Sequence, residues 1–75
     1  MRVAPTEGFV YLNFGRDWRS DFTVRIAKAL ADRLASSGLE VASLTGRRVE
    51  VRGLVLEAGG PLIELSHPEQ MQVLP

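Results

Sequence analysis

The chain contains no cysteine, and none of its apolar runs approaches the roughly 20 residues that a membrane-spanning helix needs. Without cysteine the protein has no disulfide framework, no thiolate metal ligand and no thiol nucleophile. This absence fits a reducing compartment, and residues 1–8 also lack the apolar stretch of a secretory signal peptide. We therefore expect a soluble protein, cytoplasmic by default, that does not use a membrane as a partner.

An excess of charge of either sign is also missing. The 75 residues include nine Lys or Arg and nine Asp or Glu, and a protein that binds duplex DNA tightly is usually basic. The distribution is uneven, because residues 1–53 carry all nine basic residues against six acidic ones, whereas residues 54–75 carry three Glu and no Lys or Arg. We expect one small globular domain whose N-terminal part attracts a polyanion weakly and in a salt-sensitive way.

Aromatic residues are absent after position 22. All five lie within residues 9–22, and three arginines lie in or beside the same stretch: Phe9, Tyr11, Phe14, Trp18 and Phe22, with Arg16, Arg19 and Arg25. Aromatic rings interleaved with guanidinium groups are the surface that unpaired nucleic acid binds. The sequence therefore places the candidate functional site in this stretch.

Apolar and polar residues alternate on both sides of a turn-like segment, residues 15–20, which predicts two antiparallel strands. Alternation assigns one set of side chains to the core: Val10, Leu12, Phe14, Phe22, Val24 and Ile26. The other set faces outward: Phe9, Tyr11, Asn13, Thr23 and Arg25.

The rest of the chain predicts further strands around one helix. An apolar stripe at helical spacing predicts a helix over about 26–37, ended by Gly38, with a short turn over 39–44. Alternation returns over 47–57 with an interruption at Gly53, a turn follows at 58–61, and a last strand covers 62–65 before a short apolar tail. With only a stub of strand at 2–4, we expect a mainly β, small OB-fold-like Greek-key barrel with its helix between the third and fourth strands and a truncated first strand.

Four segments together resemble a known family: Val-Tyr-Leu-Asn-Phe-Gly, Asp-Phe-Thr-Val-Arg-Ile, Leu-Thr-Gly-Arg-Arg-Val-Glu-Val-Arg-Gly and Pro-Leu-Ile-Glu-Leu-Ser-His-Pro-Glu-Gln-Met-Gln-Val-Leu. They are similar to the accessory OB-fold domains of bacterial thermonuclease (staphylococcal-nuclease-like) proteins, over about positions 9–74. The resemblance implies an OB-fold, a nucleic-acid-binding role and a parent protein with a nuclease domain. The family's full first strand is missing here, so we expect either a piece of a longer protein or an open sheet edge.

The leading hypothesis is therefore a non-catalytic module that binds single-stranded DNA or RNA. Phe9, Tyr11 and Trp18 would stack on bases, with Asn13, Arg16, Arg19 and Arg25 as polar and phosphate contacts. A purely structural alternative stays open, in which the C-terminal tail or another domain covers Phe9 or Tyr11 and Trp18 anchors its loop. A different class of function also stays open: a protein-interaction or oligomerisation module whose open edge binds a partner strand, the parent nuclease domain or a second copy.

Catalysis is the third hypothesis, and the sequence gives it little support. Asp17 and Asp21 lie near Arg16 and Arg19, as a calcium-dependent nuclease would need, but Asp, Ser and Arg are also common in polar turns. His67 has only Glu64 and Glu69 nearby and fits a turn better than a metal site. We expect no catalytic residue, metal or cofactor. A second basic group, Arg47, Arg48 and Arg52, fits a solvated strand face or a phosphate track.

Overall fold

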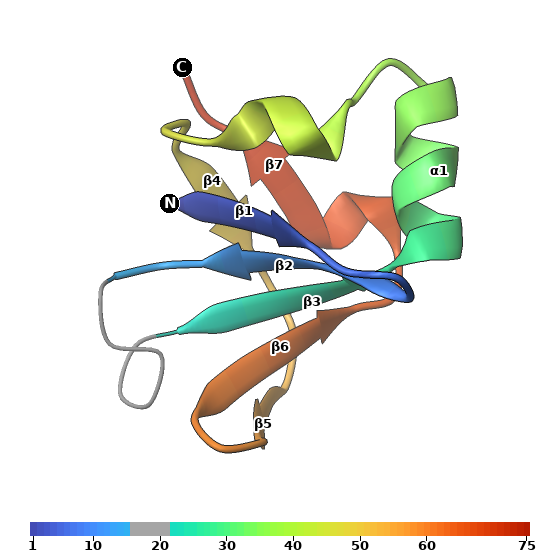
Figure 1. The fold of residues 1–75 in the computed structure, drawn as a ribbon. Helices are drawn as coiled ribbons and strands as arrows, with labels where there is room; N and C mark the ends of the chain where they lie inside the picture. Colours follow the sequence, from blue (N-terminus) through green and yellow to red (C-terminus); the bar gives the residue numbers. More distant parts are fainter. Residues whose placement is uncertain (16–21) are drawn as a thin grey trace.

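A computed structural model of the protein describes residues 1–15 and 22–75. In chain order these residues form β1 (Arg2–Pro5), β2 (Phe9–Asn13), β3 (Thr23–Ala27), α1 (Lys28–Ser36), η1 (Val41–Leu44), β4 (Val49–Val51), β5 (Val55–Glu57), β6 (Pro61–Leu65), η2 (Pro68–Gln70) and β7 (Met71–Val73) (Figure 1). None of the helices in the described part of the chain is long and apolar enough to cross a membrane.

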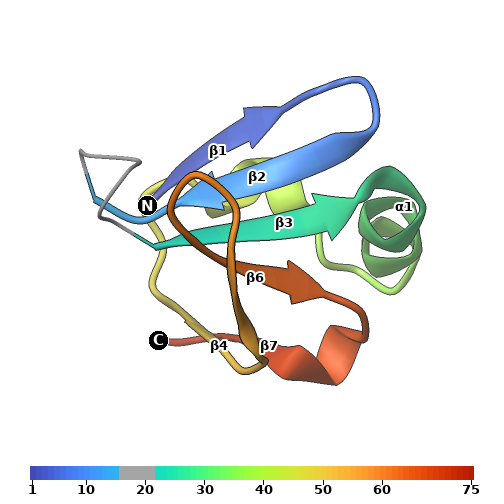
Figure 2. The same cartoon turned by 90° about the horizontal axis from the view of Figure 1, so that it is seen from below.

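The strands form a five-stranded sheet in the order β1-β2-β3-β6-β5 and a two-stranded sheet of β4 and β7 (Figures 1 and 2). The first three strands are an antiparallel meander, and β6 then returns parallel to β3 after the chain has crossed through α1, η1, β4 and β5. The expected fold class is confirmed: the protein is mainly β, and α1 lies between the third and fourth strands. The first strand is more than the stub expected at 2–4, because all four residues of β1 pair with β2. Among the described residues no pairing joins β5 back to β1, so β1 and β5 are the outer strands of this sheet.

Helix α1 follows β3 directly, and backbone hydrogen bonds satisfy terminal groups at both of its ends. No side chain caps its start, but the backbone N–H of Lys28 donates to the carbonyl of Gly8 in the β1–β2 turn at 3.1 Å. At its end Gly38 has φ +101°, and its N–H donates to Ala35 O at 3.0 Å while Leu39 N–H donates to Leu34 O at 2.8 Å. These two bonds form a Schellman motif, which explains why the helix ends where the glycine predicts.

Gly53 divides the segment 47–57 between the two sheets. The chain before it, β4, pairs with β7, whereas the chain after it, β5, pairs with β6. A Cβ atom at Gly53 would lie 2.9 Å from Ile63 Cγ2 and 3.0 Å from Gln70 Nε2, so only glycine allows this close approach. The interruption predicted from the sequence is therefore the point at which the chain leaves one sheet and joins the other.

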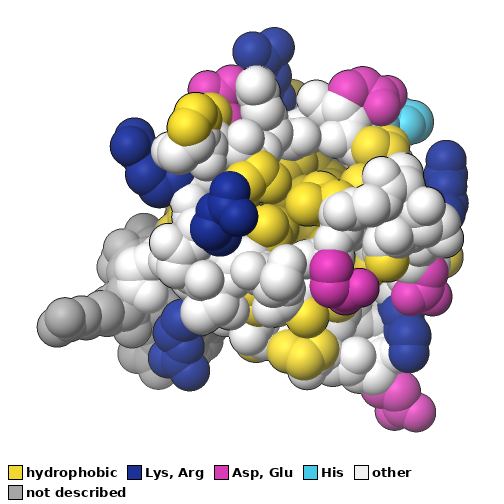
Figure 3. Space-filling view, turned by 90° about the horizontal axis from the view of Figure 1, so that it is seen from above, with side chains coloured by type: hydrophobic (Ala, Val, Ile, Leu, Met, Phe, Trp, Pro, Cys, Tyr) yellow, Lys and Arg dark blue, Asp and Glu magenta, His cyan; other side chains and the backbone are white. Residues whose placement is uncertain are grey.

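The core lies between the inner face of the five-stranded sheet, the helices and the β4–β7 pair. Its buried side chains come from all of these layers: Leu12, Val24, Ile26, Leu30, Leu34, Val41, Leu44, Leu65 and Met71. Six residues in or next to β2 and β3 were predicted to point inward. Three of them are buried, and the others, Val10, Phe14 and Phe22, are half-buried and pack against the core. Figure 3 shows that hydrophobic side chains also gather in a hollow on the face that carries η1 and β7, between charged residues of both signs.

The C-terminal tail does not lie where the purely structural alternative for the aromatic residues requires it. Instead of covering the aromatic residues of β2, residues 71–73 form β7, pair with β4 and bury Met71 in the core. The idea that the tail covers Phe9 or Tyr11 is therefore wrong. The tail was expected only as a short apolar segment, and its strand forms because β4 supplies a partner.

Candidate nucleic-acid interface

The outer face of β2 and β3 carries the side chains that alternation assigned to it. Leu12 is opposite Val24 and points into the core, so Tyr11 and Asn13, its neighbours in the strand, point away from it. Tyr11 is opposite Arg25 and Asn13 is opposite Thr23. We call this surface, from Phe9, Tyr11, Asn13, Thr23 and Arg25, the outer face; all five side chains are half-buried.

Aromatic rings and one guanidinium group form a cluster at one end of the outer face. The ring centroids of Phe9 and Tyr11 lie 6.1 Å apart at an interplanar angle of 48°, and Arg25 Cζ lies 5.0 Å from the centroid of the Phe9 ring. A cation–π contact at a partly exposed site contributes about 0.5–1 kcal/mol. The cluster therefore holds Arg25 against Phe9 while both rings keep part of their surface open to a ligand.

Arg25 also has an acidic partner, because the parallel pairing of β3 with β6 places Glu64 directly beside it. Arg25 Nη2 lies 3.1 Å from Glu64 Oε2, and the two side chains are 28% and 42% exposed. The hydrogen bond that Arg25 donates to this carboxylate raises the pKa of Arg25 above its ordinary value, so the guanidinium stays charged. Among the described residues its Nε atom is buried without a hydrogen-bond partner. A phosphate at this point would share Arg25 with Glu64.

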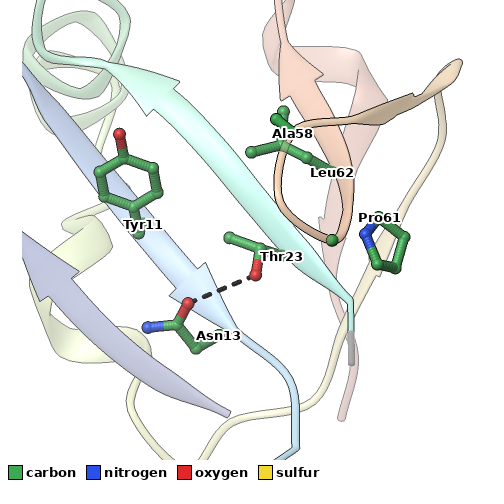
Figure 4. Close-up of a pocket in the computed structure, with 7 residues that line it drawn as sticks. Tyr11, Asn13, Thr23, Ala58, Pro61 and Leu62 are labelled. Carbon is green, nitrogen blue, oxygen red and sulfur yellow. Dashed lines mark hydrogen bonds between the residues drawn. The ribbon is translucent and has the colours of Figure 1, made fainter. Parts of the chain in front are cut away.

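A pocket of about 180 Å³ lies at the other end of the outer face (Figure 4). Tyr11, Asn13 and Thr23 form one side of it, and the turn between β5 and β6, which folds over β3, forms the other (Figure 2). The turn contributes Ala58, Gly60 and Pro61, and Leu62 completes the lining. The pocket therefore combines an aromatic ring, an amide and a hydroxyl with an apolar wall, and none of its lining side chains is charged.

The structure brings four of the seven predicted binding residues together on one surface: Phe9, Tyr11, Asn13 and Arg25. The other three, Arg16, Trp18 and Arg19, lie outside the described residues. Phe14 and Phe22, which alternation placed inward, contact each other edge to face at a centroid distance of 6.3 Å. Half of the described aromatic rings thus contribute to packing, which accounts for part of the aromatic clustering in the sequence.

The weaker candidates do not assemble into a catalytic site in the described part of the chain. Asp17 and Asp21 lie outside it, and the remaining His, Asp and Glu residues form no group of three that could hold a metal ion. His67 directly precedes η2, where Gln70 Oε1 accepts hydrogen bonds from the N–H groups of Ser66 and His67 at 2.7 and 2.8 Å. It is a turn histidine, as its surroundings in the sequence predict.

The second basic group lies apart from the outer face. Arg47, Arg48 and Arg52 are exposed and flank β4, which belongs to the other sheet. Arg52 Nη2 lies 3.4 Å from Glu50 Oε1, and the Arg52 side chain is 81% exposed. This arrangement fits a solvated strand face.

Sequence reasoning missed the contribution of the β5–β6 hairpin. Gly59 and Gly60 were correctly expected in a turn, but nothing in their spacing shows that the turn folds onto β3 or that Glu64 pairs with Arg25. Leu62 lies beside Thr23 at an outward position of the sheet, but its side chain is only 6% exposed. The apolar residue at an outward position of β6 was the one signal in the sequence that something covers this face.

Comparison of the chain with known protein families, with curated protein sequences and with solved structures finds no match. The resemblance to thermonuclease accessory domains therefore stays an inference from the four sequence segments.

Proposed function

We propose that this protein binds single-stranded nucleic acid on the outer face of β2 and β3 and catalyses no reaction there. The observation that carries the proposal is the cluster in which Arg25 lies 5.0 Å from the Phe9 ring and Phe9 lies 6.1 Å from Tyr11, next to an uncharged pocket. Aromatic rings on a sheet surface offer stacking platforms to unpaired bases, and a nearby guanidinium group attracts the phosphates. The four sequence segments add support for a module accessory to a thermonuclease-like protein.

The affinity expected from this surface is low. Two stacked bases, one on Phe9 and one on Tyr11, contribute about 2–6 kcal/mol in total, a range that includes the energy of a millimolar dissociation constant. The net charge of zero adds little attraction, and Glu64 opposes a phosphate at Arg25. We therefore expect dissociation constants in the high-micromolar to millimolar range that rise steeply with salt.

Fluorescence anisotropy of a labelled oligo-dT or oligo-U at about 20 and about 200 mM salt tests the proposal. The protein should bind at the lower salt and lose most of its affinity at the higher one. Tyr11→Ala should weaken binding by at least about fivefold, because it removes one stacking platform. Gln72→Ala, on the exposed side of β7, is the matched control and should bind like the parent protein. Absence of binding at low salt and high protein concentration would overturn the proposed function.

A second candidate function, self-association, is favoured by a different observation. Leu54, Val55 and Leu56 are consecutive large apolar residues and are 85%, 59% and 43% exposed. They lie in and beside β5, an outer strand whose second edge pairs with no strand among the described residues. Exposed apolar edge strands are sites at which another chain adds a strand.

The charges around this edge suit a second copy of the same chain. Residues 54–56 have a basic residue, Arg52, before them and an acidic residue, Glu57, after them. An antiparallel pair of β5 strands related by a two-fold axis brings the basic end of each strand near the acidic end of the other. We propose that two copies associate through residues 54–56, which extends the five-stranded sheets of both.

Sedimentation velocity over a range of protein concentrations tests the association. The parent protein should form a dimer as concentration rises, and Val55→Lys should remain monomeric because it places two like charges opposite each other at the pairing edge. Gln72→Lys adds the same charge on β7 and should leave the dimer intact. A parent protein that stays monomeric at the highest concentration, or a dimer that Val55→Lys does not weaken, would exclude the β5 edge as the self-association site.

A further inference from the structure

The pocket beside Tyr11 is small. Its volume of about 180 Å³ lies below the roughly 300 Å³ at which pockets for drug-sized ligands begin, which fits one base better than a larger ligand. The floor and far wall are apolar, from Leu62, Pro61 and Ala58. The Tyr11 ring borders the opposite side (Figure 4). A flat ring that enters here lies between the aromatic side chain of Tyr11 and an apolar surface.

The polar groups of the pocket stand in a row with a defined order. Thr23 Oγ1 donates to Asn13 Oδ1 at 3.5 Å, and in Figure 4 the amide nitrogen of Asn13 lies on the side away from Thr23. From one end to the other, the row therefore offers a donor (Asn13 Nδ2–H), an acceptor (Asn13 Oδ1) and a donor (Thr23 Oγ1–H). A separation of 3.5 Å is long for a hydroxyl hydrogen bond, so the contact between the two side chains is weak and both can bond a ligand instead.

The base edge that complements this row is acceptor, donor, acceptor. Thymine and uracil present that order as O2, N3–H and O4. Cytosine presents acceptor, acceptor, donor, which faces the Asn13 carbonyl with another acceptor. Guanine satisfies the row only when the Thr23 hydroxyl accepts a hydrogen bond instead of donating one to the base. The order of the polar groups, with the Thr23 hydroxyl as a donor, therefore favours the bases that carry two carbonyls.

The distribution of charge suits an uncharged group inside the pocket and a phosphate beside it. None of the seven lining residues has a charged side chain. Arg25 is the residue directly opposite Tyr11 in the β2–β3 pair and lies next to the pocket rather than in it. A phosphate on the Tyr11 side of the pocket would lie near this guanidinium.

We propose that this pocket receives one thymine or uracil of a bound single strand, stacked near Tyr11 and hydrogen-bonded through its Watson–Crick edge to Asn13 and Thr23. The inference rests on the proposed nucleic-acid binding and adds the class of base that the site selects. Tyr11 supplies binding energy for any base, whereas Asn13 and Thr23 supply the discrimination between bases.

The test compares short homopolymers of dT, dC, dA and dG at low salt, together with a dT strand in which N3-methylthymine replaces thymine at every position. The protein should bind dT about five- to tenfold more tightly than dC, and N3-methylation should remove that advantage because it blocks the central hydrogen bond. Asn13→Ala and the isosteric Thr23→Val should reduce the preference for dT over dC while the weaker binding to dC persists. Tyr11→Ala should weaken the binding of every strand, and Gln72→Ala should change nothing.

The outcomes separate this inference from the function on which it rests. A parent protein that binds no strand overturns both. Binding of dT, dC and dG with equal affinity, or a preference for dT that survives N3-methylation, overturns the pocket and leaves strand binding in place. The methylated strand tests the proposal on the unaltered protein, so the result does not depend on whether the variants fold.

Discussion

The outer face of β2 and β3 and the β5 edge lie on the same sheet but offer a partner different kinds of contact. The outer face presents aromatic rings, an amide and a guanidinium group that are half-buried and in contact with one another. The β5 edge presents consecutive apolar side chains, with Leu54 85% exposed, and a strand edge without a partner among the described residues. A partner of the face would be recognised by side-chain chemistry, whereas a partner of the edge would be recognised by backbone pairing and apolar area.

The two surfaces meet at the β5–β6 hairpin. Its turn forms the apolar wall of the pocket, while its first strand carries the exposed edge. A substitution that displaces the hairpin should therefore affect both surfaces, whereas one that leaves the hairpin in place can affect one surface alone.

The largest effect is expected from Gly53, which allows β5 to leave β4 and join β6. A methyl group there would lie 2.9 Å from Ile63 Cγ2, a buried side chain that cannot move without disturbing the sheet. Gly53→Ala should destabilise the fold by about 1–3 kcal/mol and weaken both strand binding and self-association. Gly8→Ala is the matched control, because nothing lies within 4 Å of its Cβ position and its φ does not lie in the left-handed region.

Urea unfolding of both glycine variants, followed by circular dichroism, measures the difference. Gly8→Ala should change the free energy of unfolding little or raise it by up to about 1 kcal/mol. Equal stabilities for the two variants would show that the close approach at Gly53 does not hold the hairpin in place. Loss of only one of the two binding activities in Gly53→Ala would show that the face and the edge do not share this support.

A smaller effect is expected when the charge opposite Arg25 is removed. Glu64→Gln frees the guanidinium for a phosphate and removes a repelling carboxylate, so oligonucleotide affinity should rise about two- to fivefold, most clearly at low salt. The free energy of unfolding should fall by less than about 1 kcal/mol, because the ion pair is partly exposed. Self-association through the β5 edge should not change.

The control for charge alone is Glu69→Gln, an exposed residue of η2. Anisotropy titrations of the two variants at several salt concentrations separate a local effect from a general one. If both variants gain the same affinity, net charge explains the gain and Arg25 has no special role. If Glu64→Gln loses affinity, the ion pair is needed to hold Arg25 in position for the strand.

The sequence predicted those parts of the site that depend on local periodicity. The outward positions of Phe9, Tyr11 and Asn13 follow from a period of two in β2, and the register with β3 follows because the two strands are neighbours in the chain. The contacts from β6 could not be predicted this way. Glu64 reaches Arg25 across 39 residues of sequence, and this contact exists only because β6 returns parallel to β3.

Burial that depends on a contact with a distant part of the chain could not be predicted from the sequence either. Leu62 stands at an outward position and is buried because the β5–β6 turn folds over it. Met71 lies in a segment too short to identify as a strand, and it is buried because β4 pairs with it. Leu54 and Val55 have the composition of a buried strand but are exposed, since no strand among the described residues covers that edge. The apolar pattern of the sequence thus shows which side chains can be buried, and the strand topology determines which of them another element covers.

The smallest effect is expected from Arg47 and Arg48, which carry charge but lie beside β4 in the other sheet. A strand that stacks on Phe9 and Tyr11 and enters the pocket stays on the outer face, so these two arginines contribute only long-range attraction. The double variant Arg47→Ala, Arg48→Ala should weaken oligonucleotide binding by less than about twofold at about 0.1 M salt, where the screening length is about 10 Å. It should also leave the slope of affinity against salt almost unchanged, because each direct phosphate contact changes that slope by about one. A loss as large as that of Tyr11→Ala, with a shallower salt slope, would mean that the bound strand continues onto β4 and that the interface extends beyond the outer face.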